Sequence, residues 1–287
     1  GTGNDYLDGG YGSDTYRFDL GGGQDTIYNY AWSGDDVAGK VDALVFGTGI
    51  LASDVTAKRE GDTLVLSITG AEDRVTIQYY FSSSDYRLDE IRFEDGTVWG
   101  YDDIQLLVTQ GSEGSDYLVG GAGDDTLNGL GGNDTIYGEA GNDTLSGGAG
   151  SDSVYAGDGN DTIDGGADDD YLIGEAGNDT LSGGTGNDYL DGGYGSDTYH
   201  FDLGGGQDTI SNYASSYYDV AGKVDALVFG TGILSSDVTA RRENNSLVLL
   251  IAGTEDRVTI QSYFSGINYR LDEIRFEDGT VWGYDDI

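Results

Sequence analysis

The chain has 287 residues, of which 51 are glycine and none is proline, cysteine or methionine. Its 53 acidic and 13 basic residues give a formal net charge of −40, which excludes nucleic acid and anionic lipid as partners because phosphate contacts need a positive surface. Without cysteine, neither disulfides nor zinc thiolate sites can form. No apolar stretch reaches the length of about 18 residues that would predict membrane insertion.

Residues 1–30 are glycine-rich and predict the end of a repeat block. The segments GTGNDYLD and GGYGSDTYR each have a glycine-rich turn followed by aspartate, and a degenerate third copy, LGGGQDTIY, occupies residues 20–28. Asp5, Asp14 and Asp25 hold the same place in the three copies. Because Gly1 falls at the second place of a copy, we expect the chain to be a segment of a longer tandem protein.

Residues 31–110 predict a β-rich capping module that covers the open end of such a block. Short β-branched and aromatic runs, separated by turns, are typical of antiparallel strands: VDALVF, DTLVLSI, DRVTIQYYF, RLDEIRF and GTVW. Residues 94–96, Glu-Asp-Gly, indicate a hairpin. Gly61-Asp62, which a later copy replaces with Asn244-Asn245, indicates a second tight turn because all four residues tolerate positive φ.

Residues 111–213 predict the main repeat array. Ten nonapeptides fill residues 111–200 without a break: GSEGSDYLV, GGAGDDTLN, GLGGNDTIY, GEAGNDTLS, GGAGSDSVY, AGDGNDTID, GGADDDYLI, GEAGNDTLS, GGTGNDYLD and GGYGSDTYH. A degenerate copy, LGGGQDTIS, follows at residues 203–211. A strict period of this kind indicates a solenoid of stacked units; the alternative is a disordered or cross-β glycine-rich array.

Each place of the nonapeptide predicts a local structure. Glycines at places one, two and four allow positive φ and a close approach of the backbone, so we expect a turn there. The Asp-x-apolar-x segment that follows predicts a strand of three to four residues with one inward side chain. Place one is Ala156 in the sixth copy and place four is Asp168 in the seventh. Since alanine tolerates positive φ poorly, we expect weaker coils there.

Two nonapeptides per coil would give two parallel sheets and stack residues that are eighteen apart. The place-six aspartates then form two columns, Asp116, Asp134, Asp152, Asp170 and Asp188 in the first and Asp125, Asp143, Asp161, Asp179 and Asp197 in the second. Carboxylates at a strand spacing of about 4.8 Å repel unless a cation lies between them, and Ca²⁺ suits such gaps because it takes six or more oxygen ligands in flexible geometry. Four gaps per column predict about eight calcium ions in the array and roughly ten in the chain, with terminal ligands at Asp5, Asp14, Asp25, Asp197 and Asp208.

Residues 214–287 predict a second β-rich capping module, because the chain repeats itself on a larger scale. Residues 1–104 reappear as residues 184–287 with 17 differences. The predicted fold is therefore all-β: a parallel β-roll flanked by β-rich capping modules.

The nonapeptides resemble the hemolysin-type calcium-binding repeats of RTX exoproteins. VDALVFGTGI, DVTAKRE, DRVTIQYYF and DEIRFEDGTVW are similar to the hemolysin-type calcium-binding related domain, and the alternation of the two resembles iron-regulated Frp-type RTX proteins. The resemblance implies secretion through a type I machinery, an extracellular or cell-surface location, folding on calcium outside the cell, and a role as scaffold in a larger exoprotein whose effector activity lies elsewhere. Without calcium, we expect the chain to be largely unfolded.

No catalytic group stands out in the sequence. The one histidine, His200, occupies place nine where the other copy has Arg17, so we interpret it as an exposed strand residue and expect no enzymatic activity. The alternative function is adhesion or glycan binding by exposed aromatic residues, with clusters at Tyr28, Tyr30 and Trp32 and at Tyr79, Tyr80 and Phe81. Trp32 becomes Ser215 and Tyr79 becomes Ser262 in the second copy, so the fold does not need those two aromatic side chains.

Overall fold

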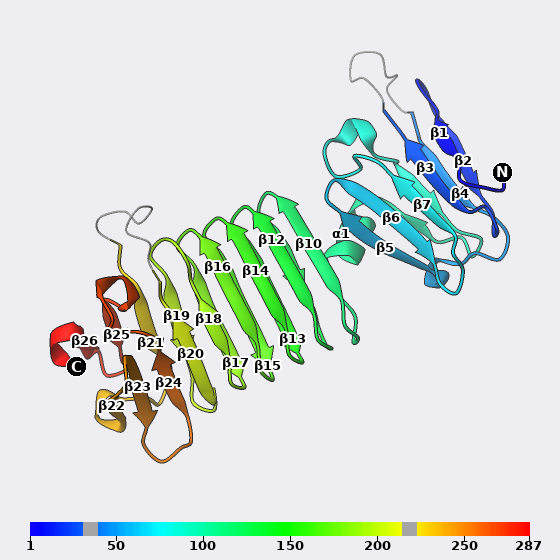
Figure 1. The fold of residues 1–287 in the computed structure, drawn as a ribbon. Coiled ribbons are helices and arrows are strands. Elements are labelled where there is room, and N and C mark those ends of the chain that lie inside the picture. The colour runs from blue at the N-terminus through cyan, green and yellow to red at the C-terminus, as the bar shows by residue number, and fades with distance from the viewer. Residues whose placement is uncertain (31–39, 214–222) are drawn as a thin grey trace. The chain divides into compact units, whose positions relative to one another are not determined.

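The computed structural model describes residues 1–30, 40–213 and 223–287. They form two compact units, residues 1–108 and 109–287, and each unit is described by itself (Figure 1). No helix in these ranges is long and apolar enough to cross a bilayer.

The array in the second unit is a roll of two parallel sheets whose strands alternate along the chain (Figure 1). One sheet contains β10 (Tyr117–Ala122), β12 (Thr135–Ala140), β14 (Ser153–Asp158), β16 (Tyr171–Ala176) and β18 (Tyr189–Asp191). The other contains β11 (Thr126–Asn128), β13 (Thr144–Ala149), β15 (Thr162–Ala167), β17 (Thr180–Thr185) and β19 (Thr198–Phe201). The predicted parallel β-roll is therefore confirmed.

Paired residues in the roll are eighteen apart, as predicted. Ile136 lies opposite Val154 in one sheet and Leu145 opposite Ile163 in the other. The place-eight side chains fill the space between the sheets and are buried in every copy: Leu118, Leu127, Ile136, Leu145, Val154, Ile163, Leu172, Leu181, Leu190 and Tyr199. Most strands therefore contribute one apolar side chain to the core; β14 also buries Ala156 and β19 also buries Phe201.

The strands are longer than the predicted three to four residues. Those from β12 to β17 have six residues each and run into the first three places of the next nonapeptide. Gly148 pairs with Gly166, and Ala149 with Ala167. The backbone ladder therefore continues through residues whose composition is typical of a turn, because parallel neighbours of identical sequence satisfy each other's amides.

The second module continues the two sheets of the roll. β20 (Gln207–Ser211) pairs in parallel with β18 and with β24 (Arg257–Ile260), which leads to β23 (Ser246–Ile251) and β22 (Val238–Glu243). β21 (Ala226–Phe229) pairs in parallel with β19 and with β25 (Glu273–Arg275), which pairs with β26 (Val281–Trp282). The expectation of a purely antiparallel module was wrong, because only β22–β23–β24 and β25–β26 run antiparallel.

The first unit has the same topology around a shorter stretch of roll. One sheet has the order β1 (Tyr6–Asp8), β3 (Gln24–Tyr28), β7 (Arg74–Ile77), β6 (Thr63–Ile68), β5 (Val55–Glu60), and the other β2 (Thr15–Phe18), β4 (Ala43–Phe46), β8 (Glu90–Arg92), β9 (Val98–Trp99). Both predicted turns are present, with Gly61 at φ 58°, Asn244 at φ 56° and Gly96 at φ 86°.

A helix, α1 (Tyr101–Thr109), follows β9 and was not predicted. Asp102 and Asp103 lie in its first turn, where their negative charges interact favourably with the positive end of the helix dipole. Ile104 and Val108 are buried in the core of the first unit. Short 3-10 turns occur at Ala52–Asp54, Ser84–Tyr86, Ser235–Asp237, Ile267–Tyr269 and Tyr284–Asp286.

The outer faces of the two array sheets differ in chemistry. A ladder of tyrosine rings crosses one sheet, with adjacent centroids 4.9 to 6.1 Å apart: Tyr117, Tyr137, Tyr155, Tyr171 and Tyr189. These tyrosines come from places seven and nine of the repeat, whereas place seven of the other sheet is a row of threonines: Thr126, Thr144, Thr162, Thr180 and Thr198. We call these faces the tyrosine sheet and the threonine sheet.

Candidate calcium-binding columns

The place-six aspartates are stacked in the two predicted columns. Within a column, each backbone N–H donates to Oδ1 of the aspartate eighteen residues later, at 2.7 to 3.0 Å. The first column is Asp116, Asp134, Asp152, Asp170 and Asp188, and the second is Asp125, Asp143, Asp161, Asp179 and Asp197. One carboxylate oxygen of each stacked aspartate therefore closes the backbone ladder at the edge of the roll.

The second carboxylate oxygen of these aspartates, Oδ2, lies in a different environment. Within the described residues, seven buried Oδ2 atoms have no hydrogen-bond partner: those of Asp134, Asp143, Asp152, Asp161, Asp170, Asp179 and Asp188. An ionised carboxylate buried without a compensating charge is costly. The same buried oxygen recurs in seven successive turns. The columns therefore require a cation or a proton to neutralise the carboxylates.

Place one of the nonapeptide forms the wall against which this second oxygen lies. A Cβ added to Gly147 would stand 2.3 Å from Oδ2 of Asp152 and 2.6 Å from the carbonyl oxygen of Gly165 in the next coil. The same overlap recurs at Gly129, with Oδ2 of Asp134 at 2.1 Å. Carboxylate and carbonyl oxygens thus converge at place one, where the missing side chain of glycine leaves room for them.

Glycine is needed for different reasons at the three places. Places two and four take positive φ, as at Gly148 (106°) and Gly150 (112°), whereas place one does not. The prediction of positive φ was therefore right for places two and four and wrong for place one, where glycine instead allows the predicted close approach of the backbone. Asp168 adopts φ 73° as its position requires, and Ala156 is buried without positive φ. Alanine at position 156 thus departs from the pattern by taking up space at place one and not by requiring a strained backbone.

Burial raises the pKa of the stacked carboxyl groups. Desolvation is the main cause throughout, with neighbouring aspartates of the column adding repulsion in most cases. The pKa rises to about 6 for Asp143, Asp152 and Asp188 and to about 8 for Asp170 and Asp179. Without a metal ion, several of these groups would be partly protonated near neutral pH.

The donor set fits calcium. Within the described ranges, no three acidic or histidine side chains gather into a metal cluster, so an ion at a column would be held by one or two carboxylates together with backbone carbonyl oxygens. Ca²⁺ accepts such mixed oxygen sets at 2.3–2.6 Å in flexible geometry, whereas zinc prefers nitrogen and sulfur ligands. The buried Oδ2 atoms and the turn carbonyls would hold it.

The predicted terminal ligands lie at the ends of the columns. Oδ1 of Asp208 accepts the N–H of Asp188 at 3.2 Å, which extends the first column by one turn. In the first unit Oδ1 of Asp25 accepts the N–H of Asp5 at 3.0 Å, and Asp14 belongs to a separate column. Place one of the degenerate copies is Leu20 or Leu203, so Asp25 and Asp208 lack the open glycine position of the array.

Asp116 differs from the aspartates that follow it. Its Oδ2 accepts hydrogen bonds from the backbone N–H and the hydroxyl of Ser112, at 2.6 and 2.8 Å. The first copy, GSEGSDYLV, has serine at place two. The first turn of the column is therefore partly closed by the protein itself.

Two further column members were not predicted. Oδ1 of Asp225 accepts the N–H of Asp197 at 3.0 Å, and Oδ1 of Asp42 accepts the N–H of Asp14 at 2.9 Å. Both begin the sequence Asp-Ala-Leu-Val-Phe, which keeps the Asp-x-apolar-x spacing without the glycines. That spacing was the signal that could have identified them.

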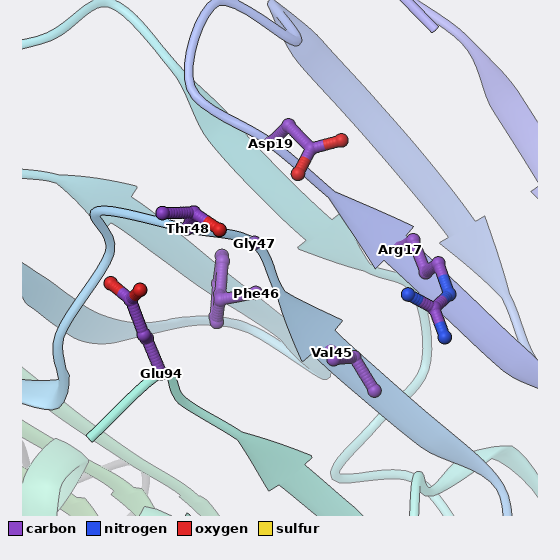
Figure 2. Close-up of a pocket in the computed structure, with 7 residues that line it drawn as sticks. All are labelled: Arg17, Asp19, Val45, Phe46, Gly47, Thr48 and Glu94. Carbon is purple, nitrogen blue, oxygen red and sulfur yellow. The ribbon is translucent and has the colours of Figure 1, made fainter. Parts of the chain in front are cut away.

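A surface pocket of the first unit lies at the end of β4, with Arg17, Asp19, Thr48 and Glu94 around it (Figure 2). Glu94 is already used there, because its Oε2 accepts the backbone N–H of Gly49 at 2.6 Å. Arg17 is replaced by His200 in the second unit, where the histidine lies on β19 opposite Ser182 and Val228. His200 is half-buried, not exposed as predicted, since neighbouring strands flank it on both sides.

A parallel roll whose turns present stacked aspartates with unsatisfied inner oxygens defines a calcium-binding repeat protein. The family model of the RTX calcium-binding nonapeptide repeat (4 copies) matches residues 1–27, 110–145, 137–172, 146–181 and 173–210. That of the haemolysin-type calcium binding protein related domain matches residues 64–103 and 247–286. The chain therefore contains RTX calcium-binding nonapeptide repeats and carries one haemolysin-type calcium binding protein related domain in each of its two modules.

Two known proteins are similar to parts of this chain. The "Iron-regulated protein FrpA" of Neisseria meningitidis serogroup C is 44% identical over 118 residues, which are 40% of this chain and 10% of that protein. The extracellular lipase LipA from Serratia marcescens aligns in structure with 89% of this chain and 36% of its own, at 20% identity and a TM-score of 0.21. That TM-score is too low to establish a shared fold, so the fold assignment rests on the strand registers.

Proposed function

We propose that the chain is a calcium-loaded scaffold segment of a secreted protein. About eight ions lie along the two columns of the array and roughly ten in the whole chain, held by the place-six aspartates and by turn carbonyls. The single observation that carries this proposal is the row of seven buried Oδ2 atoms without a hydrogen-bond partner in the described residues. Asp5, Asp14, Asp25, Asp197 and Asp208 remain proposed terminal ligands.

Calcium supplies the stability that the thin core does not. A ligand that binds only the folded state stabilises it by RT ln(1 + [L]/Kd), which is about 1.4 kcal/mol for a site at ten times its Kd and about 11 kcal/mol for eight such sites. That is comparable to the stability of a whole domain. At the far lower free calcium of a cytoplasm the same sites contribute almost nothing, so the array folds after export.

The likeness to RTX exoproteins supports export by a type I secretion machinery and an extracellular or cell-surface location. We assign no catalysis to the chain, because the recurring aspartates are occupied in the ladder of the roll. The effector activity of a longer parent protein would reside in other segments.

Isothermal titration of calcium into the chelator-treated chain, with native mass spectrometry of the loaded form, tests the proposal. We expect about eight ions bound between residues 111 and 200 at saturation. Replacing Asp134, Asp143, Asp152, Asp161, Asp170, Asp179 and Asp188 together by asparagine should remove most of them. Fewer than about six ions in the unaltered array would contradict the column arrangement.

Glycan binding is a second candidate, favoured by an aromatic surface that, among the described residues, is complete in the first unit and reduced in the second. In the first unit Tyr28 contacts Tyr6, Tyr30, Tyr79 and Tyr86, with ring centroids 5.8 to 6.4 Å apart. In the second unit the positions of Tyr28 and Tyr79 are serines, and one pair, Tyr213 and Tyr269, retains the contact.

Two residues of the predicted aromatic clusters are not available to a ligand, and a third lies outside the described residues. Tyr80 is 1% exposed and belongs to the core, and Phe81 packs against that core beneath the guanidinium of Arg59. Trp32 and Ser215 lie outside the described residues. Tyr79 is 48% exposed, so the surface available to a ligand is the tyrosine cluster around Tyr28.

A glycan array probed with the chain and with the double variant Y28S/Y79S tests this candidate. The variant copies the second unit, so it should keep the fold and the calcium count. Loss of a glycan signal in the variant alone would support binding at the cluster. Equal signals, or no signal for either protein, would contradict glycan binding at the cluster and leave the scaffold function alone.

A further inference from the structure

The last buried carboxylate of the second aspartate column is that of Asp225, and the protein satisfies both of its oxygens. The N–H of Asp225 donates in turn to Oδ2 of the exposed Asp272 at 2.9 Å. Asp225 is completely buried. Its Oδ1 accepts the N–H of Asp197 like every rung before it. Its Oδ2 lies 2.9 Å from the ammonium of Lys223 and accepts a hydrogen bond from Nδ2 of Asn212 at 2.8 Å. The oxygen that lacks a partner in the array therefore has two here, and one of them is a cation.

In the first unit the last buried carboxylate, that of Asp42, is satisfied in the same way, and the N–H of Asp42 donates to Oδ2 of the exposed Asp89. Oδ1 of Asp42 accepts the N–H of Asp14, while Oδ2 lies 3.1 Å from the ammonium of Lys40 and accepts from Nδ2 of Asn29 at 3.0 Å. Lys40 and Lys223 are both largely buried, with side chains 20% and 19% exposed. A lysine that is mostly removed from water and placed on a buried carboxylate has a defined electrostatic role.

The asparagine of each site is held in one orientation. Oδ1 of Asn212 accepts the hydroxyl of Tyr199 at 3.0 Å, and its Nδ2 also donates to the carbonyl of Arg270 at 2.8 Å. The N–H of Gly192 donates to the same tyrosine oxygen at 2.9 Å. Tyrosine occupies place eight only in the copies that hold Tyr16 and Tyr199, so the last full nonapeptide is adapted to this site.

We infer that Lys223 with Asn212 at Asp225, and Lys40 with Asn29 at Asp42, take over at the last buried aspartate of each column the charge compensation that calcium provides within the array. The buried part of the column thereby ends at a cation that belongs to the chain. The strands that follow, β21 with β25 and β24 with β23, then need no metal ion to bury Asp225. This inference concerns a site outside the proposed calcium positions and stands whether or not the array is loaded.

Hydrogen exchange of the full chain, measured by mass spectrometry in excess EGTA, tests it. We expect the amides of β23 and β24 to stay protected in the unaltered chain without calcium. Lys223→Met should lower their protection by about 100-fold, since removing one partner of a buried ion pair leaves the other charge uncompensated. Lys223→Arg, which keeps a cation, should retain most of the protection.

Two controls separate charge compensation from general damage. Arg241→Met removes an exposed cation that pairs with Glu243 on β22 and should leave the protection unchanged. In every variant the amides of β6 and β7, where Lys40 is intact, provide the matched reference in the same molecule. Peptides from the two modules are distinguishable because Tyr79 corresponds to Ser262.

A double-mutant cycle with Asp225→Asn completes the test. If Lys223 acts as the counter-ion, Lys223→Met should cost at least about tenfold less protection in the Asp225→Asn background than in the unaltered chain. Equal costs in both backgrounds, or no effect of Lys223→Met, would overturn the inference. Calcium dependence of the array amides reports on the proposed function independently, because those peptides cover residues 111–200.

Discussion

The array and the second module share one parallel ladder but complete it by different means. In the array, most strands add a single apolar side chain to the core, and seven successive turns leave a buried carboxylate oxygen without a partner in the described residues. In the module, β23 buries Leu247, Val248 and Leu249 in succession, and Lys223 and Asn212 satisfy the last buried aspartate, Asp225. The same fold can thus be completed by ions from solution or by side chains.

Calcium removal should separate the two regions most completely. In excess EGTA we expect the array to lose its strand signal in far-ultraviolet circular dichroism, because seven uncompensated buried carboxylates oppose its thin core. Hydrogen exchange should show protection retained in β23 and β24. We therefore expect unfolding without calcium in the array and not in the chain as a whole. Unchanged strand content in EGTA would contradict it.

Asp152 tests the stacking within one column. Its carboxylate lies between the rungs of Asp134 and Asp170, so Asp152→Ala should weaken two neighbouring sites and raise the calcium midpoint by about tenfold. Asp152→Asn keeps an acceptor for the N–H of Asp134 and isolates the loss of charge. Sites near Asp143 and Asp161 should change much less. A titration with unchanged midpoint and cooperativity would show that place six does not bind the ion.

The pH dependence of the calcium-free array should run opposite to that of the loaded one. Burial raises the pKa of Asp170 and Asp179 to about 8, so their contribution to stability is complete below the pKa of an unfolded aspartate, about 3.9, and is lost as pH rises through about 8. The calcium-stripped chain should therefore show more strand signal near pH 4.5 than near pH 8. Calcium, which needs the carboxylate, should stabilise more at higher pH. A calcium-free signal that grows with pH would contradict these assignments.

The place-one position offers a matched pair of variants. Gly147→Ala puts a methyl group 2.3 Å from Oδ2 of Asp152 and should raise the calcium midpoint of the first column about threefold. Ala156→Gly removes the methyl group beside Asp161 and should lower the midpoint of the second column by a similar factor. Measuring the midpoint, not the overall stability, separates this effect from the backbone entropy of glycine.

The smallest effect is expected at His200. Arg17 occupies the same position in the first unit, so His200→Arg should shift the calcium midpoint by less than about twofold. The variant is a baseline for the others because it changes a strand residue of the roll without touching either aspartate column. A shift as large as that of Asp152→Ala would place a ligand on the outer face of β19.

The sequence predicted the roll well because its period fixes the register. Ten copies in phase determine which residues stack, and the pairings of Ile136 with Val154 and of Leu145 with Ile163 follow from that. The modules were harder to predict, because period-two patterns do not distinguish parallel from antiparallel strands. Strand 226–229 is parallel only because Asp225 continues a column that begins in the array.

The candidate site was predictable to the level of residue type and stacking. The place-six aspartates could be assigned from the period. The period did not reveal that Oδ1 accepts the backbone N–H while Oδ2 is left without a partner. Nor could the closure by Lys223, which is 26 residues from Asp197 in the chain. Such contacts depend on a long connection returning to the column, and no local pattern encodes that return.

The alternation of strands between two sheets gives the array a parity. Each nonapeptide moves the chain to the opposite sheet, so inserting or deleting one copy would transfer every later strand from the tyrosine sheet to the threonine sheet or back. β20 would then meet the wrong neighbour, Asp208 would follow the wrong column, and Lys223 would neutralise a different row. Recombination between copies can therefore lengthen or shorten this roll without rebuilding its end only in steps of eighteen residues.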